Sequence, residues 1–172
     1  VYGFAGNDVF AVGGLDVLHY DGDSWSAMSG GNSFEAVWGT SGTDVWAVGA
    51  ASTLTHYDGT WTPDSAPVSN LHGAWGSGPT DIWAGGTFGV LTHFNGTDWT
   101  SVPAVSGNLN AFSGTSSNDV FAVGLGGAII HYNGSQGSGM DSGTGDWLRG
   151  IWAHPTRAIA VGYNGTIVQR VP

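Results

Sequence analysis

Histidine and aspartate recur at matched spacing along this chain, and both residue types can bind metal ions. Four histidines are each followed by an aromatic residue: His19, His56, His93 and His131. Four aspartates each open a short apolar segment: Asp8, Asp44, Asp81 and Asp119. A single metal ion needs its ligands within about 2.1 Å, and equivalent positions in separate repeats cannot converge on one ion. We therefore expect each histidine to bond to nearby backbone or to the repeated aspartate, and each aspartate to accept backbone N–H groups of the preceding turn.

A glycine- and serine-rich segment interrupts the regular spacing and carries two carboxylates. Twelve residues, Ser135–Asp146, separate Gly134 from Trp147, where the other copies have only one or two. Calcium prefers six to eight oxygen ligands, so Asp141 and Asp146 are the candidate metal ligands, with calcium as the cofactor. An ordinary solvated loop is the alternative, because the spacing matches no specific calcium-binding loop.

A short motif repeats along the whole chain and predicts its architecture. The segment Asp8–Gly13 returns at Asp44–Gly49, Asp81–Gly86 and Asp119–Gly124, and a degenerate fifth copy is Ala158–Gly162. The four aspartates are 36, 37 and 38 residues apart. An aromatic-small pair precedes each copy, and an Asp-Gly or Asn-Gly step followed by tryptophan comes after most of them. Such self-similarity is typical of repeat proteins.

Each unit is expected to form four short antiparallel strands. The aromatic-small pair marks the first strand, the motif the second, and the histidine-aromatic pair the third. The Asp-Gly or Asn-Gly step favours a hairpin turn, and the fourth strand begins at Trp25, Trp61, Trp99 or Trp147. These units predict an all-β, five-bladed β-propeller of four-stranded antiparallel blades with one blade incomplete. A β-solenoid, a pair of sandwiches and part of a larger propeller are the alternatives.

The predicted propeller is one domain, residues 1–172, with approximate repeats 1–36, 37–73, 74–110, 111–150 and 151–172. The first copy begins inside its first strand at Val1, and the last ends after its third strand. A first residue other than methionine favours a processed, exported chain, so we expect an extracellular, cell-surface or periplasmic location.

Charge and composition exclude several classes of partner. The chain has three arginines, no lysine and a formal net charge of −10. Such a chain cannot neutralise the phosphates of a nucleic acid, and an anionic membrane surface would repel it. No apolar run approaches the ~20 residues of a membrane helix, so membrane insertion is not expected. Cysteine is absent, which excludes disulfides and thiolate metal sites.

The segment His56–Trp61 resembles a relaxed Asp-box, the hairpin motif of sialidase-type, BNR-like propellers. Its Asp58, Gly59 and Trp61 match the box, whereas the leading serine has no clear counterpart. The Trp-Gly pairs and the repeated motif are similar to those of secreted bacterial propellers and of tachylectin-like lectins. The resemblance implies a propeller fold and leaves the function open, since propellers host many unrelated functions.

The residues of a sialidase-like catalytic centre are missing from this sequence. The resemblance implies three arginines that clamp a substrate carboxylate, but Arg149, Arg157 and Arg170 all fall in the last quarter of the chain. Glu35 is the single glutamate, so paired-carboxylate glycoside hydrolysis is poorly supported. No catalytic or cofactor-binding residue is predicted, and an enzyme is not expected.

The sequence therefore favours a non-catalytic propeller that binds a protein or serves as a subunit of a larger assembly. Variable loops in a repeat scaffold are where binding is expected; they are Pro63–Asn70, Pro103–Asn108 and Ser135–Asp146. A multivalent carbohydrate-binding lectin is the alternative, because tryptophan faces can stack on sugars, although all nine tryptophans fall in repeating slots that suit core packing. A glycoside hydrolase is the least favoured function.

Overall fold

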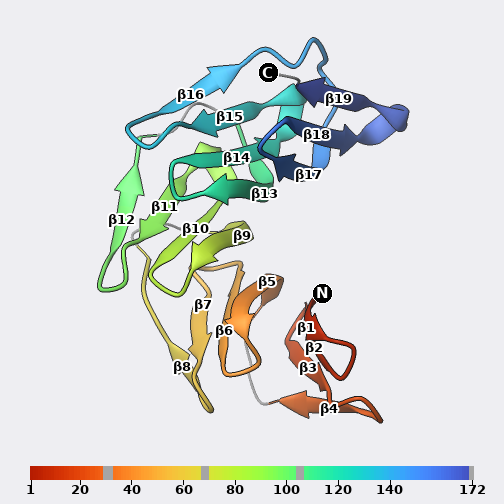
Figure 1. The fold of residues 1–172 in the computed structure, drawn as a ribbon, viewed down its shortest axis with the longest axis vertical. Coiled ribbons are helices and arrows are strands. Elements are labelled where there is room, and N and C mark those ends of the chain that lie inside the picture. The colour runs from red at the N-terminus through yellow and green to blue at the C-terminus, as the bar shows by residue number, and fades with distance from the viewer. Residues whose placement is uncertain (29–32, 67–69, 104–106, 171–172) are drawn as a thin grey trace.

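The computed structural model describes residues 1–28, 33–66, 70–103 and 107–170. Within them the chain forms five antiparallel sheets in sequence order, which we call blades 1 to 5. Figure 1 shows the blades side by side in an open arc, with blade 1 at one end and blade 5 at the other. The first strand of each blade lies on the concave side of the arc and the fourth strand on the convex side.

Among the described residues, blades 1 to 4 each contain four strands and blade 5 contains three. Blade 1 comprises β1 (Tyr2–Ala5), β2 (Asp8–Gly13), β3 (Asp16–Tyr20) and β4 (Trp25–Met28). Blade 2 comprises β5 (Phe34–Ser41), β6 (Asp44–Gly49), β7 (Leu54–Tyr57) and β8 (Trp61–Pro63). Blade 3 comprises β9 (Leu71–Gly78), β10 (Asp81–Gly86), β11 (Leu91–Phe94) and β12 (Trp99–Val102).

Blade 4 comprises β13 (Leu109–Ser116), β14 (Asp119–Gly124), β15 (Ile129–Tyr132) and β16 (Gly137–Met140), and blade 5 comprises β17 (Leu148–His154), β18 (Arg157–Gly162) and β19 (Ile167–Arg170). Three one-turn 3-10 segments join second to third strands: η1 (Thr87–Gly89), η2 (Leu125–Gly127) and η3 (Tyr163–Gly165). The predicted antiparallel four-stranded units, and the incomplete last blade, are confirmed. The approximate repeats predicted to begin at residues 37, 74, 111 and 151 begin inside the first strands of blades 2 to 5. We therefore define each blade by its sheet.

The core consists of apolar seams between neighbouring blades. Second-strand residues point alternately to the two faces of each sheet, which is why these strands read as continuous apolar runs. In the seam between blades 2 and 3, Trp38 and Trp46 pack with Leu71, Ile82 and Ala84. The seam between blades 3 and 4 repeats this arrangement around the fully buried Trp83.

The glycine of the Trp-Gly pair has a packing role in these seams. A Cβ atom on Gly76 would overlap the ring of Trp38 from the preceding blade, and one on Gly114 would overlap the ring of Trp75. The tryptophan of one blade therefore lies directly against the glycine backbone of the next. Glycine holds this place in blades 2, 3 and 4, as Gly39, Gly76 and Gly114; the residue before it is tryptophan in blades 2 and 3 and serine in blade 4. No helix in the described part of the chain is long and apolar enough to cross a membrane.

Candidate functional site

The repeated histidines and aspartates pair with each other inside each blade. His Nε2 donates to aspartate Oδ1 over 2.8 Å (His19–Asp8), 2.7 Å (His56–Asp44), 2.6 Å (His93–Asp81) and 2.7 Å (His131–Asp119). Each histidine ring also lies against the second-strand aromatic residue, as Trp83 and His93 do at a centroid distance of 4.2 Å. Of the two partners that we expected for these histidines, nearby backbone or the repeated aspartate, the structure shows the aspartate.

The bonds expected of the aspartates need a correction. In blades 2, 3 and 4, the second carboxylate oxygen accepts the hydroxyl of a serine or threonine four residues earlier: Thr40, Ser77 and Thr115, respectively. These side-chain hydroxyls and the histidines supply the bonds that we expected from backbone N–H groups. The first strand ends beside the start of the second, which places the hydroxyl within reach of the carboxylate. The cluster is therefore a scaffold that ties the first three strands of a blade together.

The two candidate calcium ligands take part in different hydrogen bonds. Asp141 Oδ1 accepts the backbone N–H of Gly143 over 2.8 Å. Asp146 accepts the hydroxyl of Thr166 and, over 2.8 Å, the side-chain N–H of Asn164. Among the described residues no group of three or more histidine, aspartate or glutamate side chains is arranged to hold a metal. Calcium binding at Asp141 and Asp146 remains a prediction.

Hydrogen bonds also explain the two carboxyl groups with perturbed acidity. The bonds from Thr166 and Asn164 lower the pKa of Asp146 below its ordinary value of 3.8. The backbone N–H groups of Ser24 and Asp23, each 2.9 Å from Asp21 Oδ1, lower the pKa of Asp21 in the same way. Both carboxylates therefore stabilise turns in their ionised form.

The segment Ser135–Asp146 is not an insertion before the fourth strand, as the sequence suggested. Gly137 begins β16 and pairs with Tyr132, as Trp99 pairs with Phe94 in blade 3. Trp147 instead lies just before β17, and its carbonyl oxygen accepts the N–H of Tyr163 over 2.9 Å. Trp147 therefore occupies a connection between blades, and glycine holds the tryptophan slot of blade 4.

Not every tryptophan is a core residue, which corrects a second expectation. Trp25, Trp147 and Trp152 are 49%, 45% and 50% exposed. Trp25 and Trp152 belong to the first and last blades, whose outer faces have no neighbouring blade in the described chain. The tryptophan positions are repeated along the chain, but a tryptophan side chain is buried only where a neighbouring blade covers it.

One edge of the arc, which we call the loop face, carries the chain segments that vary most between blades. The connections from one blade to the next and the turns between second and third strands meet there. Backbone bonds join them: Ala50 N–H to Ser33, Thr87 N–H to Asn70, and Leu125 N–H to Asn108. Two of the three predicted binding loops end here, at Asn70 and Asn108, while their residues 67–69 and 104–106 lie outside the described part of the chain.

Phe88 projects from the loop face on the η1 turn. Its side chain is 83% exposed, and its φ of 61° places it in the left-handed region. This conformation is costly for a bulky residue, and η2 and η3 have Gly126 and Asn164 at the same place. The Phe88 N–H donates to Asn108 Oδ1 over 2.9 Å. This bond ties the η1 turn to the connection between blades 3 and 4. An aromatic ring is thus held in solvent at a position where blades 2, 4 and 5 have Ala51, Gly126 and Asn164.

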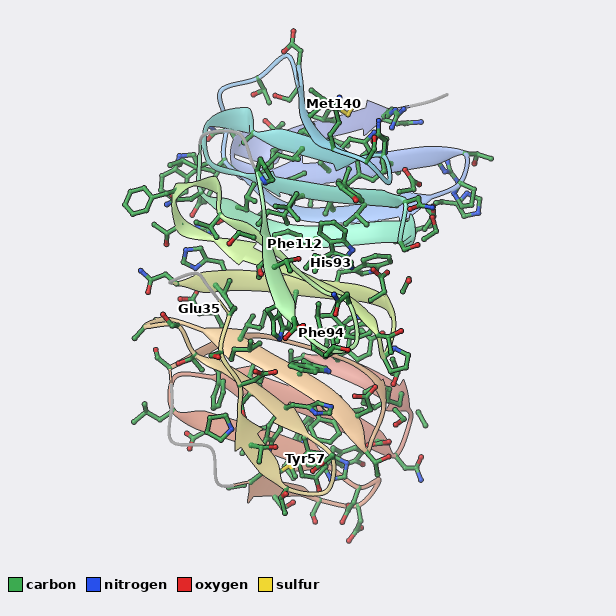
Figure 2. All side chains as sticks on the ribbon, turned by 90° about the vertical axis from the view of Figure 1, so that its left-hand side faces the viewer. Glu35, Tyr57, His93, Phe94, Phe112 and Met140 are labelled. Carbon is green, nitrogen blue, oxygen red and sulfur yellow. The ribbon has the colours of Figure 1, made fainter. Side chains whose placement is uncertain are left out.

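A charged hydrogen-bonded group lies on the same face. His72 Nδ1 donates to Glu35 Oε2 over 2.6 Å, joining β9 to β5 of the preceding blade, and His72 Nε2 lies 3.1 Å from Thr87 Oγ1. Thr87 directly precedes Phe88. Figure 2 shows Glu35 at the edge of the blades. The equivalent first-strand residues of blades 4 and 5 are Asn110 and Arg149, so this position differs in every blade where it is described.

Sequence reasoning did not single out Phe88 or His72. The sequence does show that the positions of Phe88 and His72 depart from the repeat, because the neighbouring copies have different residue types there. Neither the exposure of Phe88 nor its backbone conformation follows from that signal alone. The loop-face candidate site therefore consists of Glu35, His72, Thr87, Phe88 and Asn108.

Among the described residues, the three arginines and the single glutamate lie in different blades. Arg149, Arg157 and Arg170 lie on β17, β18 and β19 of the last blade, whereas Glu35 lies on β5 of blade 2.

The sequence matches no known family profile and no curated protein at a significant level. Solved structures do resemble the fold. The computationally designed Ika8 protein aligns over 95% of this chain and 57% of its own, with a TM-score of 0.75 and 13% identity. The fold is that of a β-propeller.

Two further structures extend this comparison. YCF48 bound to D1 peptide aligns over 81% of this propeller and 50% of its own chain, with a TM-score of 0.62 and 18% identity. The designed Ika4 protein aligns over 81% of this propeller and 91% of its own chain, with a TM-score of 0.67 and 15% identity. The propeller thus spans about half the length of YCF48 and Ika8. At these identities the likeness establishes the fold alone.

Proposed function

We propose that this propeller is a non-catalytic protein-binding module whose loop face, centred on Phe88, contacts the partner. The observation that carries the proposal is the exposed Phe88 ring, held in a left-handed conformation by the bond to Asn108. Strained conformations persist where the surroundings determine them, and they cluster at binding sites. Aromatic side chains with few rotatable bonds are effective anchors at protein interfaces.

The surrounding groups suit a polypeptide ligand. Glu35 and His72 offer an acceptor and an imidazole beside the Phe88 turn, so an apolar anchor is flanked by polar groups. This combination is usual at protein interfaces, which have an apolar centre and a polar rim. A neighbour in structure, YCF48, is described in complex with a peptide of D1, which is consistent with peptide binding on this fold.

A displayed peptide library tests the proposal. Peptides selected on the wild-type propeller should lose binding to the Phe88→Asn variant, because asparagine adopts positive φ readily and keeps the turn folded. The matched control is Trp25→Asn, which removes another exposed aromatic side chain, on β4 of blade 1 and away from the loop face. Equal binding of the selected peptides to wild type and Phe88→Asn would contradict the proposal.

The lectin alternative has weaker support. The exposed tryptophans Trp25, Trp147 and Trp152 lie on a fourth strand, a connection and a first strand, so they do not form the equivalent sites expected of a multivalent lectin. A glycan array would test it, with a stoichiometry near the number of blades as the result that favours it. An extracellular, cell-surface or periplasmic location remains part of the proposal, to be checked by fractionating the source cells.

A further inference from the structure

On the loop face of blade 5, an arginine lies against the aromatic residue of the η3 turn. The Arg149 guanidinium lies 4.9 Å from the centre of the Tyr163 ring and donates to the Tyr163 hydroxyl over 2.5 Å. It also lies 5.5 Å from the centre of the Trp147 ring. The electrons of an aromatic face attract a cation that is placed over it. One aromatic residue of the loop face therefore already has a cation of this chain beside it.

The corresponding position of blade 3 carries a different side chain. Arg149 lies where the register of β17 shifts against β18, and His72 lies where the register of β9 shifts against β10. His72 Nδ1 carries a hydrogen, because the Glu35 carboxylate to which it is bonded can only accept. The other ring nitrogen lies against Thr87 of the η1 turn. Next to the η1 turn the loop face therefore presents a carboxylate held by an imidazole, whereas next to η3 it presents a guanidinium.

No cation of the chain accompanies Phe88 in the same way. The Phe88 side chain is 83% exposed, although blades 2 and 4 flank blade 3 on both sides. Residues 1–148 contain all 13 carboxylates and neither lysine nor arginine, so their formal charge is −13, and the three later arginines bring the total to −10. In the described part of the chain these arginines lie against other rings. A cation over the Phe88 ring must therefore come from another molecule.

The turn that carries Phe88 is fixed before any partner binds. The Thr87 N–H donates to the Asn70 carbonyl oxygen over 3.0 Å, and the Phe88 N–H donates to Asn108 Oδ1 over 2.9 Å. These bonds attach the turn to the connections on both sides of blade 3. A ring on a fixed turn loses little conformational freedom when a ligand packs against it, and such preorganisation favours binding.

We propose that the partner of the loop face is a basic polypeptide segment, and that an arginine of this segment stacks on Phe88 and is attracted by the Glu35 carboxylate. A planar guanidinium suits this place because it can stack on an aromatic ring and bond to a carboxylate. The acidic character of blades 1 to 4 attracts such a segment and repels an acidic one. This inference rests on the proposed protein-binding function and adds the chemistry of the partner.

A pentapeptide, acetyl-Gly-Ser-Arg-Ser-Gly-amide, is the probe, and its control has citrulline, which keeps the shape of arginine without the charge. Each peptide is titrated into the ¹⁵N-labelled propeller in low-salt buffer, and the amide signals are followed by NMR. The arginine peptide should shift the signals of Phe88 and Glu35. The citrulline peptide should bind about fivefold more weakly or less, because it lacks the cation. Added salt should weaken binding of the arginine peptide and leave that of the citrulline peptide nearly unchanged.

Two variants that each remove one negative charge locate the site. Glu35→Gln keeps an acceptor for the His72 N–H and should weaken binding of the arginine peptide about threefold or more. Asp98→Asn is the matched control, since Asp98 is an exposed residue of the turn between β11 and β12, at the opposite end of β11 from η1. It should leave the affinity unchanged. Phe88→Asn should abolish the difference between the arginine and citrulline peptides.

Several outcomes would overturn the inference. Equal affinities of the arginine and citrulline peptides would mean that the cation is not recognised. Equal losses from Glu35→Gln and Asp98→Asn would mean that the acidic chain attracts the peptide without a defined site. Library-selected peptides that need Phe88 but contain no basic residue would reject the basic partner and leave the proposed function in place. Library-selected peptides that bind Phe88→Asn as well as wild type would instead reject the proposed function itself.

Discussion

A half-buried histidine–aspartate pair stabilises each of the first four blades. In blade 3, Asp81 accepts His93 and Ser77, while His93 stacks on Trp83. Because these polar groups satisfy one another beside an apolar seam, their desolvation is compensated. Blade 5 has Arg157 and Gln169 at the two positions and still forms three strands. The pair is therefore a stabilising element of blades 1 to 4 and is not required for a sheet to form.

Asp81→Ala is expected to lower the free energy of unfolding by about 1–3 kcal/mol, because it leaves the His93 N–H and the Ser77 hydroxyl without their acceptor. Urea unfolding monitored by tryptophan fluorescence would measure the change. Asp58→Ala is the control, since Asp58 is an exposed turn residue, and its effect should stay within about 0.5 kcal/mol. Equal effects of the two substitutions would show that the pair adds little.

A substitution of Phe88 should weaken partner binding without lowering the stability of the fold. Asparagine tolerates the left-handed conformation better than phenylalanine, so Phe88→Asn should leave the free energy of unfolding unchanged or raise it by up to about 1 kcal/mol. Thermal unfolding would measure this. A clear loss of stability would mean that the exposed ring supports the fold, and the binding interpretation of this residue would then fail.

At the scale of strands, the sequence predicted most elements because four landmarks recur in four of the five copies. The prediction was wrong at Trp147. Blade 4 has Gly137 at the start of its fourth strand, where blades 1 to 3 have tryptophan, so the sequence pattern assigned the start of that strand to the next tryptophan along the chain. Backbone pairing places β16, and pairing across a hairpin does not require the landmark residue. The loop-face site was missed for a related reason: its residues differ between blades, so a repeat pattern carries no information about them.

The connection between blades 4 and 5 depends on ionised Asp146. Hydrogen bonds from Thr166 and Asn164 lower its pKa below 3.8, so its contribution to stability is present above that value and is lost as the pH falls through the lowered pKa. Asp146→Asn should therefore unfold at lower urea than wild type at about pH 6, and the difference should shrink in strongly acidic buffer. A difference that stays constant with pH would contradict this role.

At the scale of the molecule, stability comes from the seams between blades. The seams between blades 1 and 2, 2 and 3, and 3 and 4 are formed by second-strand apolar residues of both blades together with tryptophan or phenylalanine rings. The cluster between blades 4 and 5, around Val123 and Leu148, contains no aromatic residue. Stability in such arrays is approximately a sum of unit and neighbour terms. The two end blades each have only one described neighbour, and the exposed Trp152, Val161 and Ile167 of blade 5 follow from that.

Trp38 and Trp152 provide the sharpest test of this view, because they occupy the same first-strand position in blades 2 and 5. Trp38 is 5% exposed and packs against Gly76 of blade 3, whereas Trp152 is 50% exposed and touches mainly its own blade. Trp38→Ala should cost about 3–5 kcal/mol, as expected for a buried aromatic residue, and Trp152→Ala about 1 kcal/mol. Chemical denaturation of the two variants gives the comparison. Similar losses of unfolding free energy in the two variants would mean that this tryptophan stabilises its own blade. The seams would then not be the main source of stability.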